Sequence, residues 1–310
     1  MKKILLLCCF FGLCFSYLEA RPQSESSAPL RVGIMPDSDS IPFMLARDMG
    51  FYGQEGAAVE LIVFSNPQER DAALLAGRID GTISDLIAVS FLIAGGHDFK
   101  VTSLTDGRYG IATSAQSGIK TLTGLRGKRI GMSVNTIIQY SVDAQLAAAG
   151  VSMSEYEAVA VPRMPLRLEM LQQGQIEAAS LPDPLLTAAV TQGAILLSAT
   201  DENTGINGVM IFSKKTLDTR LDALKAFYRA YYRAASQINA DPDAHRKFLV
   251  EKAGFPESVK NTYRFVHYRK PSLPDEKQVA NVLNWLKARK LLDAEIAYAD
   301  IVDPRAVSEW

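Results

Sequence analysis

The stretch LAGRIDGT at residues 75–82 is echoed later in the chain by QQGQIEAA at residues 172–179. Each copy places a glycine, Gly77 or Gly174, where a helix is expected to end, and follows it with an acidic residue and then small strand residues. Glycine suits the left-handed position that terminates many helices, and small residues let helices pack closely on a strand. The echo predicts two similar α/β units. The alternative is a chance likeness between any two α/β segments.

Short β-rich runs alternate with helical patterns on both sides of the two copies. This alternation is typical of parallel sheets covered by helices and built from right-handed crossovers. The predicted fold class is therefore α/β with two lobes. Strands are expected at 31–35, 58–64, 79–84, 100–105, 109–113, 129–133, 157–161, 176–181, 194–199 and 208–212, and helices at 41–50, 66–78, 85–95, 135–150, 164–175, 183–193, around 227–238 and at 276–289.

Polar turns follow the predicted strands in both units. Ligands of parallel sheets bind outside the carboxyl ends of the strands, so two facing lobes would enclose a cleft lined by these turns. Helix N-termini at the turns offer free N–H groups and a partial positive charge. The alternative is that each Ser, Asn or Asp only caps its helix. The candidate ligand-binding residues are Asp37, Ser38, Asp39, Ser40, Ser65, Asn66, Asp85, Tyr109, Asn135, Thr136, Arg163 and Asp183.

Residues 1–20 have the layout of a secretory signal peptide, with two lysines, an apolar run at 4–15 and small residues at the exit. The apolar run is too short to span a bilayer comfortably. All three cysteines lie within this leader, so a mature chain would have no disulfide, no cysteine-bound metal and no thiol nucleophile. Cleavage before a lipidated Cys14 is the alternative, although the usual small residue before the cysteine is missing.

The composition fits a soluble chain of two domains, and the net charge of -1 gives no reason to expect nucleic-acid binding. The three histidines, His97, His245 and His267, have no metal-ligand spacing. The sequence contains no G-x-S-x-G elbow, phosphate loop or dinucleotide fingerprint. We therefore predict no catalytic residue, no metal and no cofactor.

Three motifs carry a resemblance to a known family. Residues 41–46 (IPFMLA), with the following 50–56, resemble the P-F-x-x-A…G-F-[FY]-x-x-E-G stretch of periplasmic binding proteins for sulfonates, taurine and thiamine-pyrimidine precursors. Residues 118–131 are similar to their G-I-K…L-x-G-K-x-I-G segment, and 181–184 to their x-P-[ED]-P turn. The match runs in order through nearly the whole mature chain. It indicates the SsuA/TauA/ThiY, or NMT1/THI5-like, family, and these motifs say little about the ligand.

The resemblance implies a type II periplasmic-binding fold with two lobes and a two-crossing hinge. The first lobe would comprise residues 30–113 plus 207–310, and the second residues 114–206. It also implies a periplasmic or other extracytoplasmic protein that closes on a small molecule and delivers it to an ABC permease with its ATPase. We expect a monomer whose membrane association runs through the permease or through a lipid anchor at Cys14.

Two other functional classes remain as alternatives. One is an enzyme on the same fold, such as the yeast branch that makes the thiamine pyrimidine. That branch carries a cysteine-rich iron-binding motif, and the mature chain here has no cysteine. The other is a sensory or adhesive module at the cell surface, which neighbouring permease and ATPase genes would argue against.

The candidate residues favour an amine-bearing or heterocyclic ligand. Asp37, Asp39, Asp85 and Asp183 would bring several carboxylates to one cleft, and Tyr109 would offer a ring for stacking. A buried sulfonate near unpaired carboxylates would be unfavourable. A sulfonate or taurine ligand is the alternative, with Asn135, Thr136 and Arg163 as its donors.

Overall fold

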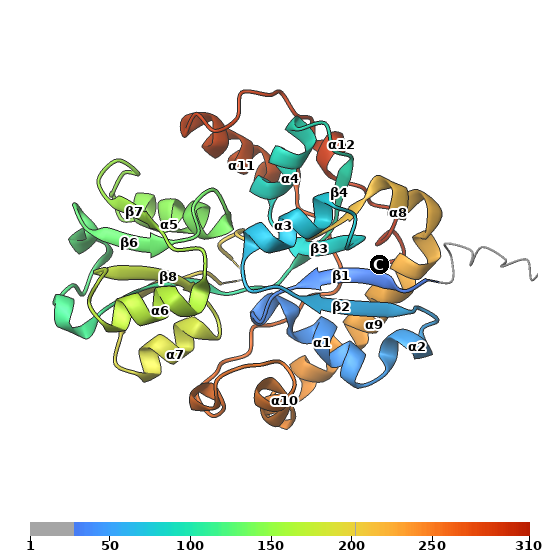
Figure 1. Cartoon of the computed structure of the whole chain (residues 1–310), viewed down its shortest axis with the longest axis horizontal. Helices are drawn as coiled ribbons and strands as arrows, with labels where there is room; N and C mark the ends of the chain where they lie inside the picture. The colour runs from blue at the N-terminus through green and yellow to red at the C-terminus, as the bar shows by residue number, and fades with distance from the viewer. Residues whose placement is uncertain (1–27, 202) are drawn as a thin grey trace, which may run out of the picture.

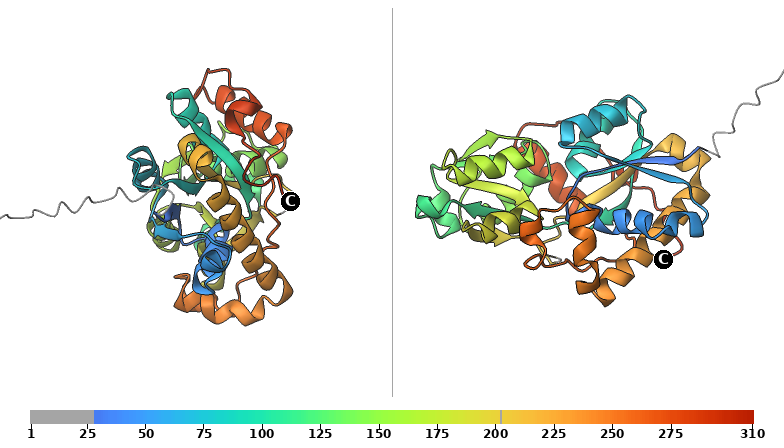
Figure 2. Two further views of the ribbon diagram at one scale, coloured as in Figure 1. Left: turned by 90° about the vertical axis from the view of Figure 1, so that its right-hand side faces the viewer. Right: turned by 60° about the horizontal axis from the view of Figure 1, so that its bottom comes forward.

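The computed structural model describes residues 28–201 and 203–310, and the predicted signal peptide and Cys14 lie outside the described residues. The chain forms two α/β lobes, each built on one five-stranded sheet, which lie side by side in Figure 1 and in the right-hand view of Figure 2. The two predicted lobes are thus confirmed.

The first lobe holds one sheet between two layers of helices. Its strand order is β2-β1-β3-β10-β4, and side chains alternate between its two faces. On β10, for example, Val209 and Ile211 pack with α3, α4 and α11, whereas Met210 and Phe212 pack with α1 and α9. The elements are β1 (Leu30–Ile34), α1 (Ile41–Asp48), α2 (Phe51–Gln54), β2 (Val59–Val63), α3 (Pro67–Leu75), β3 (Gly81–Ser84), α4 (Leu86–Ala94), β4 (Phe99–Thr105), β10 (Gly208–Ser213), α8 (Lys214–Thr219), α9 (Leu221–Ala240), α10 (Arg246–Glu251), α11 (Glu276–Ala288) and α12 (Tyr298–Ile301).

The second lobe repeats this plan with fewer helices. Its strand order is β7-β6-β8-β5-β9. Helix α5 buries Ile138, Val142 and Leu146 in this lobe's core. The elements are β5 (Tyr109–Thr113), β6 (Arg129–Met132), α5 (Ile137–Ala148), β7 (Glu157–Ala160), α6 (Met164–Gln172), β8 (Ala178–Pro182), α7 (Leu185–Thr191) and β9 (Ile195–Ala199).

Each sheet contains one antiparallel strand, which corrects the expectation of purely parallel sheets. β10 runs against β3 and β4, and β5 runs against β8 and β9. The physical reason is the hinge, because β5 and β10 each enter a lobe from the other one and therefore run away from the cleft. The assignment of 109–113 to the first lobe is also corrected, since β5 pairs in the second sheet.

The predicted elements are present, and their ends lie within three residues of those predicted, except that α9 begins six residues before the predicted apolar pattern. The amphipathic pattern at 227–238 belongs to α9, whose apolar face is buried against Phe43 and Phe212 while Arg229 and Arg233 pair with Glu55. The helices that sequence reasoning missed, α2, α8, α10 and α12, have four to six residues. Such lengths are too short to show a helical period.

The internal repeat is reproduced in atomic detail. Gly77 and Gly174 both adopt left-handed φ angles, +65° and +68°. The acidic residue after each glycine pairs with an arginine on the parallel neighbouring strand of its own sheet: Asp80 with Arg31 of β1 and Glu177 with Arg129 of β6. The two lobes therefore share one construction, as the echo predicts.

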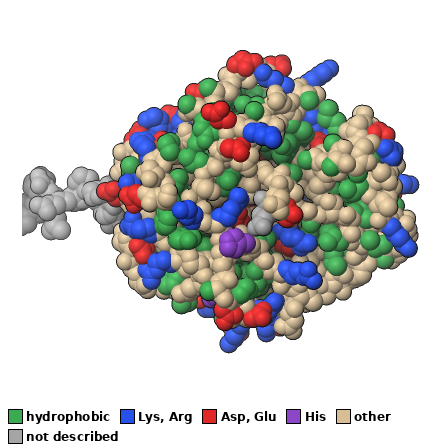
Figure 3. All heavy atoms as spheres, turned by 180° about the vertical axis from the view of Figure 1, so that it is seen from behind, with side chains coloured by type: hydrophobic (Ala, Val, Ile, Leu, Met, Phe, Trp, Pro, Cys, Tyr) green, Lys and Arg blue, Asp and Glu red, His purple; other side chains and the backbone are tan. Residues whose placement is uncertain are grey.

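Charges on the surface are mixed. Seen from behind, basic and acidic side chains are interspersed over both lobes (Figure 3), in line with the near-zero net charge. No helix among the described residues has a stretch long and apolar enough to cross a bilayer.

Candidate functional site

A small cavity of about 40 Å³ lies between the lobes, and both lobes contribute its walls. A cavity needs about 10–15 Å³ by this measure for each water molecule, so this one has room for about three. Its lining residues are Met35, Asp37, Asp39, Pro67, Arg70, Ile83, Ser84, Asp85, Tyr109, Ser133, Thr136, Ile137, Ile138, Met164 and Pro182.

Asp37 and Asp85 form the polar part of the first-lobe wall. Asp37 follows β1 and caps a 3-10 turn, with its Oδ1 accepting from the backbone N–H of Ser40 at 3.2 Å and from the Ser40 hydroxyl at 2.9 Å. Asp85 caps α4, with its Oδ1 accepting from the N–H of Ala88 at 2.8 Å. Its Oδ2 accepts from the N–H of Ile137, at the start of α5 in the other lobe, at 3.2 Å. Asp85 thus caps one helix in each lobe.

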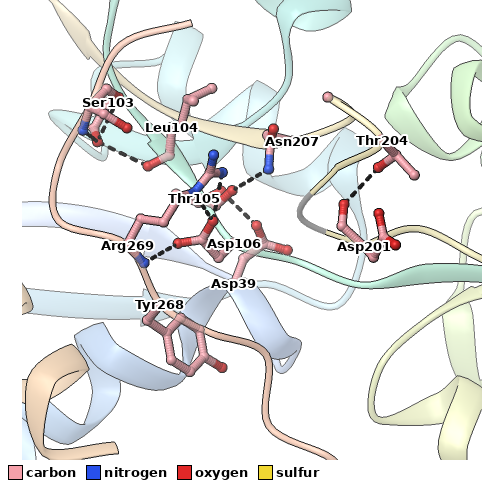
Figure 4. A network of polar contacts seen from close by, with 12 residues as sticks. Asp39, Ser103, Leu104, Thr105, Asp106, Asp201, Thr204, Asn207, Tyr268 and Arg269 are labelled. Carbon is pink, nitrogen blue, oxygen red and sulfur yellow. Dashed lines mark hydrogen bonds and ion pairs between the residues drawn. The ribbon is translucent and has the colours of Figure 1, made fainter. Parts of the chain in front are cut away.

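Asp39 lies at the hinge. Its carboxylate accepts from the hydroxyls of Thr105, at the end of β4, and Tyr109, at the start of β5, at 2.6 and 2.9 Å. A side chain at Gly107 or Gly208 would collide with this carboxylate, so glycines on both crossings make room for it. Figure 4 shows Asp39 beside Thr105 in this hinge network. Both oxygens of Asp39 therefore serve the hinge.

An ion pair also braces the same crossing. Arg269, from the long segment before α11, contacts Asp106 through its backbone N–H and its guanidinium at 2.7–2.8 Å. This pair is also visible in Figure 4. Neighbouring Tyr268 donates its hydroxyl to the carbonyl of Ser38 at 2.9 Å. The C-terminal third of the chain thus holds the hinge in place.

Burial raises the pKa of the three lining carboxyls. For Asp39 desolvation dominates, and the pKa rises to about 6 despite hydrogen bonds from Thr105 and Tyr109. For Asp37 desolvation comes first and repulsion from Asp39 second, and its pKa is raised well above the usual range. For Asp85 desolvation raises the pKa, while the positive charge of Arg70 opposes the rise. Each carboxyl would gain from a donor or cation placed in the cavity.

Arg70 is the lining residue that sequence reasoning missed. It lies on the first turn of α3, is 2% exposed, and places its guanidinium against the cavity. Its Nε donates to Asp71 at 2.8 Å, but its buried Nη2 has no hydrogen-bond partner among the described residues. The hydroxyl of Ser84, also in the lining, is likewise buried without a partner. The feature of the sequence that could have identified it is an arginine on the first turn of the helix that begins after Asn66.

The rest of the lining is mostly apolar. Ile83 and Met35 come from the first lobe, and Ile137, Ile138 and Met164 from the second. The opening of α5 also presents Thr136, whose hydroxyl caps the helix by accepting from the N–H of Ile138 at 3.2 Å. The cavity therefore combines a charged wall with an apolar one, a combination typical of small-molecule sites.

Five of the twelve candidate residues line the cavity: Asp37, Asp39, Asp85, Tyr109 and Thr136. The other seven lie outside its lining: Ser38, Ser40, Ser65, Asn66, Asn135, Arg163 and Asp183.

Several of these seven make hydrogen bonds within the fold. Asn66 caps α3, Ser65 is exposed and donates to Glu69, and Ser38 accepts from the N–H of Arg108. Ser40 donates to Asp37, and Asn135 is exposed with a left-handed φ of 56°. The capping alternative therefore describes Asn66 well.

Asp183 and Arg163 differ most from their predicted places. Asp183 is fully buried and bound to Arg108 at 2.9 Å and to Thr187, so its charge already has a partner. Arg163 is exposed at the start of α6, whereas the cation of the cavity is Arg70. The cation that lines the cavity is thus a different residue from the one that the sequence analysis named.

The described residues contain no group of three or more His, Cys, Asp or Glu side chains arranged to hold a metal ion. Tyr140 packs edge-on against Trp285, with the two ring centroids 5.7 Å apart.

Comparisons with known proteins agree with this architecture. A Brachyspira hyodysenteriae protein described as an ABC transporter periplasmic binding protein is 23% identical over 259 residues, covering 78% of this chain and 75% of its own. The 4-amino-5-hydroxymethyl-2-methylpyrimidine phosphate synthase of Schizosaccharomyces pombe is 29% identical, over 38% of this chain and 35% of its own.

Among solved structures, the alkanesulfonate-binding protein SsuA from Xanthomonas axonopodis pv. citri, bound to MOPS, superposes with a TM-score of 0.76. It is 22% identical and covers 89% of this chain and 98% of its own. This likeness confirms the predicted type II periplasmic-binding fold. The family model described as NMT1/THI5 like matches residues 37–245, more than half of the sequence. The chain therefore belongs to the NMT1/THI5-like family.

Proposed function

We propose that this protein is the extracytoplasmic binding component of an ABC importer and captures a small molecule between its lobes. The observation that carries this proposal is the cavity at the lobe interface, whose walls come from both lobes while the chain crosses between the lobes at 106–108 and 200–207. A ligand that contacts both walls binds the closed form better than the open form and so drives closure.

The interface supports closure as a movement of whole lobes. Asp85 reaches the N-terminus of α5, and the N–H of Ser38 donates to the carbonyl of Asp183 at 3.0 Å. These contacts connect the two lobes. A ligand that needs more space than about three water molecules can enter the cavity only when the lobes separate. The relative described as an ABC transporter periplasmic binding protein supports the same function.

For the ligand, the lining favours a molecule with amino or ring N–H donors, such as an aminopyrimidine or another vitamin precursor. Three carboxyls with raised pKa face or border the cavity, and a donor-bearing ligand would stabilise their ionised forms. A sulfonate or taurine is the second candidate, and the likeness to alkanesulfonate-binding SsuA supports it.

We also propose that the protein is not an enzyme. Its likeness to the pyrimidine synthase covers 38% of the chain, and no cysteine follows Cys14, so the cysteine-rich iron motif of the yeast branch is missing. We also propose that the protein is a monomer and that it is held at the membrane through its permease or through a lipid on Cys14. The mass of the exported protein separates cleavage near residue 20 from lipidation at Cys14.

A thermal-shift screen tests the proposal. Taurine, alkanesulfonates, aminopyrimidines, thiamine and riboflavin cover both candidate ligand classes, and a ligand at 100 times its Kd stabilises the folded state by about 2.7 kcal/mol. We expect at least one compound to raise Tm without being chemically altered. Conversion of a compound to product would contradict the non-enzymatic assignment, and tight binding of simple sulfonates alone would contradict the preference for donors.

A further inference from the structure

Arg70 has a counterpart in the second lobe. Arg70 lies seven residues before Gly77, and Arg167 lies seven residues before Gly174. Both are on the first turn of the helix that leads into the repeated glycine, α3 in one lobe and α6 in the other. Both are also buried, with exposures of 2% and 0%. The repeat thus supplies an internal reference for what an arginine does at this position.

Arg167 is fully engaged inside its own lobe. Its Nε and Nη2 donate to the carbonyl of Val161 at 3.0 and 2.8 Å, and its Nη1 donates to the carbonyl of Ser180 at 2.6 Å. Its Nη2 also donates to the hydroxyl of Ser133. This guanidinium holds the strand ends of the second lobe together and leaves no nitrogen for a ligand.

Arg70 makes far fewer contacts. Its Nε donates to Asp71, its Nη2 is buried without a partner in the described part of the chain, and the residue lines the cavity. A buried guanidinium N–H that has left water without gaining an acceptor is costly. Such a cost in a cavity wall is expected where a ligand supplies the missing acceptor.

We propose that Arg70 binds an acceptor or anionic group of the ligand, while Asp37 and Asp85 bind donors of the same molecule. The inference rests on the proposed binding function and narrows its ligand class. The ligand is a small molecule that carries both a hydrogen-bond acceptor and an amino or N–H donor, either as a zwitterion or as an amino-substituted nitrogen heterocycle. This class spans both candidates above, because taurine and an aminopyrimidine each combine the two groups.

The cavity's polar groups agree with this class. Its volume of about 40 Å³ is too small for a ring, so even a small ligand of this class enters only as the lobes separate. With Arg70 on the same wall as Asp37 and Asp85, a ligand that has only acceptors offers the two carboxyls no donor, and a ligand that has only donors leaves the Nη2 of Arg70 without an acceptor. Only a molecule with both groups satisfies both sides.

Calorimetric titration with two matched sets of probes tests the inference on the full mature protein. One set is taurine, ethanesulfonate, which lacks the amine, and ethylamine, which lacks the sulfonate. The other is 4-aminopyrimidine, pyrimidine, which lacks the amine, and aniline, which lacks the ring nitrogens. We expect the complete member of at least one set to bind at least about tenfold more tightly than both incomplete members.

Arg70→Met tests the residue itself. Arg70→Lys is a second variant that keeps the positive charge but loses the planar guanidinium and its paired N–H donors. In Arg70→Met, the complete probe is expected to bind no better than the donor-only probe of its set. Arg70→Lys is expected to keep part of the preference for an anionic probe. Far-UV circular dichroism of both variants establishes that they are folded.

Three results would overturn the inference: donor-only probes binding as tightly as complete ones, an unchanged preference in Arg70→Met, or no binding by either complete probe. Failure of the proposed function would look different. Binding of a simple alkanesulfonate alone in the wider screen would preserve a transport role while rejecting this ligand class, whereas no binding by any compound of that screen would count against the proposed function itself.

Discussion

Arg70 and Arg167 occupy matching places in the two lobes. The guanidinium nitrogens of Arg167 all donate hydrogen bonds within its own lobe, whereas the Nη2 of Arg70 has no partner among the described residues. The surrounding framework shows no such difference. Arg31 with Asp80 and Arg129 with Glu177 repeat one contact in each lobe. The contrast suggests that the repeat preserves the pairs that build each sheet and diverges where a side chain meets the cavity.

The largest expected effect separates the two arginines by stability. Arg167→Met should lower the free energy of unfolding by about 3–5 kcal/mol, because several buried acceptors lose their only charged donor. Arg70→Met should cost about 1 kcal/mol or less, since few protein groups depend on it. Urea unfolding of both variants at one pH checks the difference. Equal losses would mean that Arg70 is structural, and the contrast would disappear.

The hinge carboxyl Asp39 predicts a pH effect. Its pKa is about 6 in the folded chain and 3.8 in its ordinary state, so the folded form holds the proton more tightly. Its contribution to stability is therefore greatest below about pH 4 and falls as pH rises to about 6, by about 2–3 kcal/mol in total.

Asp39→Asn removes this titration. The unfolding free energy of the wild type relative to Asp39→Asn should decrease between pH 4 and pH 7, on top of a constant loss from the altered hydrogen bonds to Thr105 and Tyr109. Denaturant unfolding at several pH values measures it. A difference that stays constant with pH would show that Asp39 is not held in the buried, desolvated state described here.

A contact far from the cavity provides a third test. Asp143 of α5 accepts from the indole N–H of Trp285 at 2.7 Å and from Arg289 at 2.6–2.7 Å, which joins the second lobe to the end of α11 on the first. All of its partners are protein groups, so this contact favours closure whether or not ligand is bound.

Asp143→Asn should shift the ligand-free protein about tenfold toward the open form, which corresponds to about 1.4 kcal/mol. Small-angle X-ray scattering should then show a larger radius of gyration. Glu155→Gln is the control, because Glu155 pairs with Arg126 inside the second lobe. Indistinguishable scattering from Asp143→Asn and the wild type would reject a latching role for this contact.

The smallest effects belong to the repeated framework pairs. Asp80→Asn and Glu177→Gln each break a partly exposed ion pair, so each should cost about 0.5–1 kcal/mol. The two losses should also be similar, because the contacts match. Thermal unfolding of both variants measures them. A severalfold difference would show that the lobes do not share their framework.

Much of the fold could be predicted because strong local signals determine it. The glycine after each repeated helix, Asn66 before α3 and the apolar face of α9 each act within a few residues of their own position. The antiparallel strands β5 and β10 could not be predicted in this way. Their direction depends on which lobe the chain comes from, and that is a property of the whole topology.

The candidate site was harder to predict because turn residues look alike in sequence. Asp85 and Asp183 both follow a strand, yet one faces the cavity and the other is neutralised by Arg108. Arg70 and Arg163 both lie near helix starts, and only their orientation decides which reaches the cavity. Residue type and spacing identify the turns, whereas the partner of each charge depends on tertiary packing.

The fluorescence of Trp285 tests the central claim, that a ligand held by Arg70 closes the lobes, most directly. The chain has two tryptophans, and Trp310→Phe would leave Trp285 as the sole reporter at the lobe interface. We predict that a probe with both donor and acceptor produces a saturable change in Trp285 emission, and that Arg70→Met abolishes it at the same probe concentration. Binding without any change in Trp285 emission, or an undiminished change in Arg70→Met, would contradict the account.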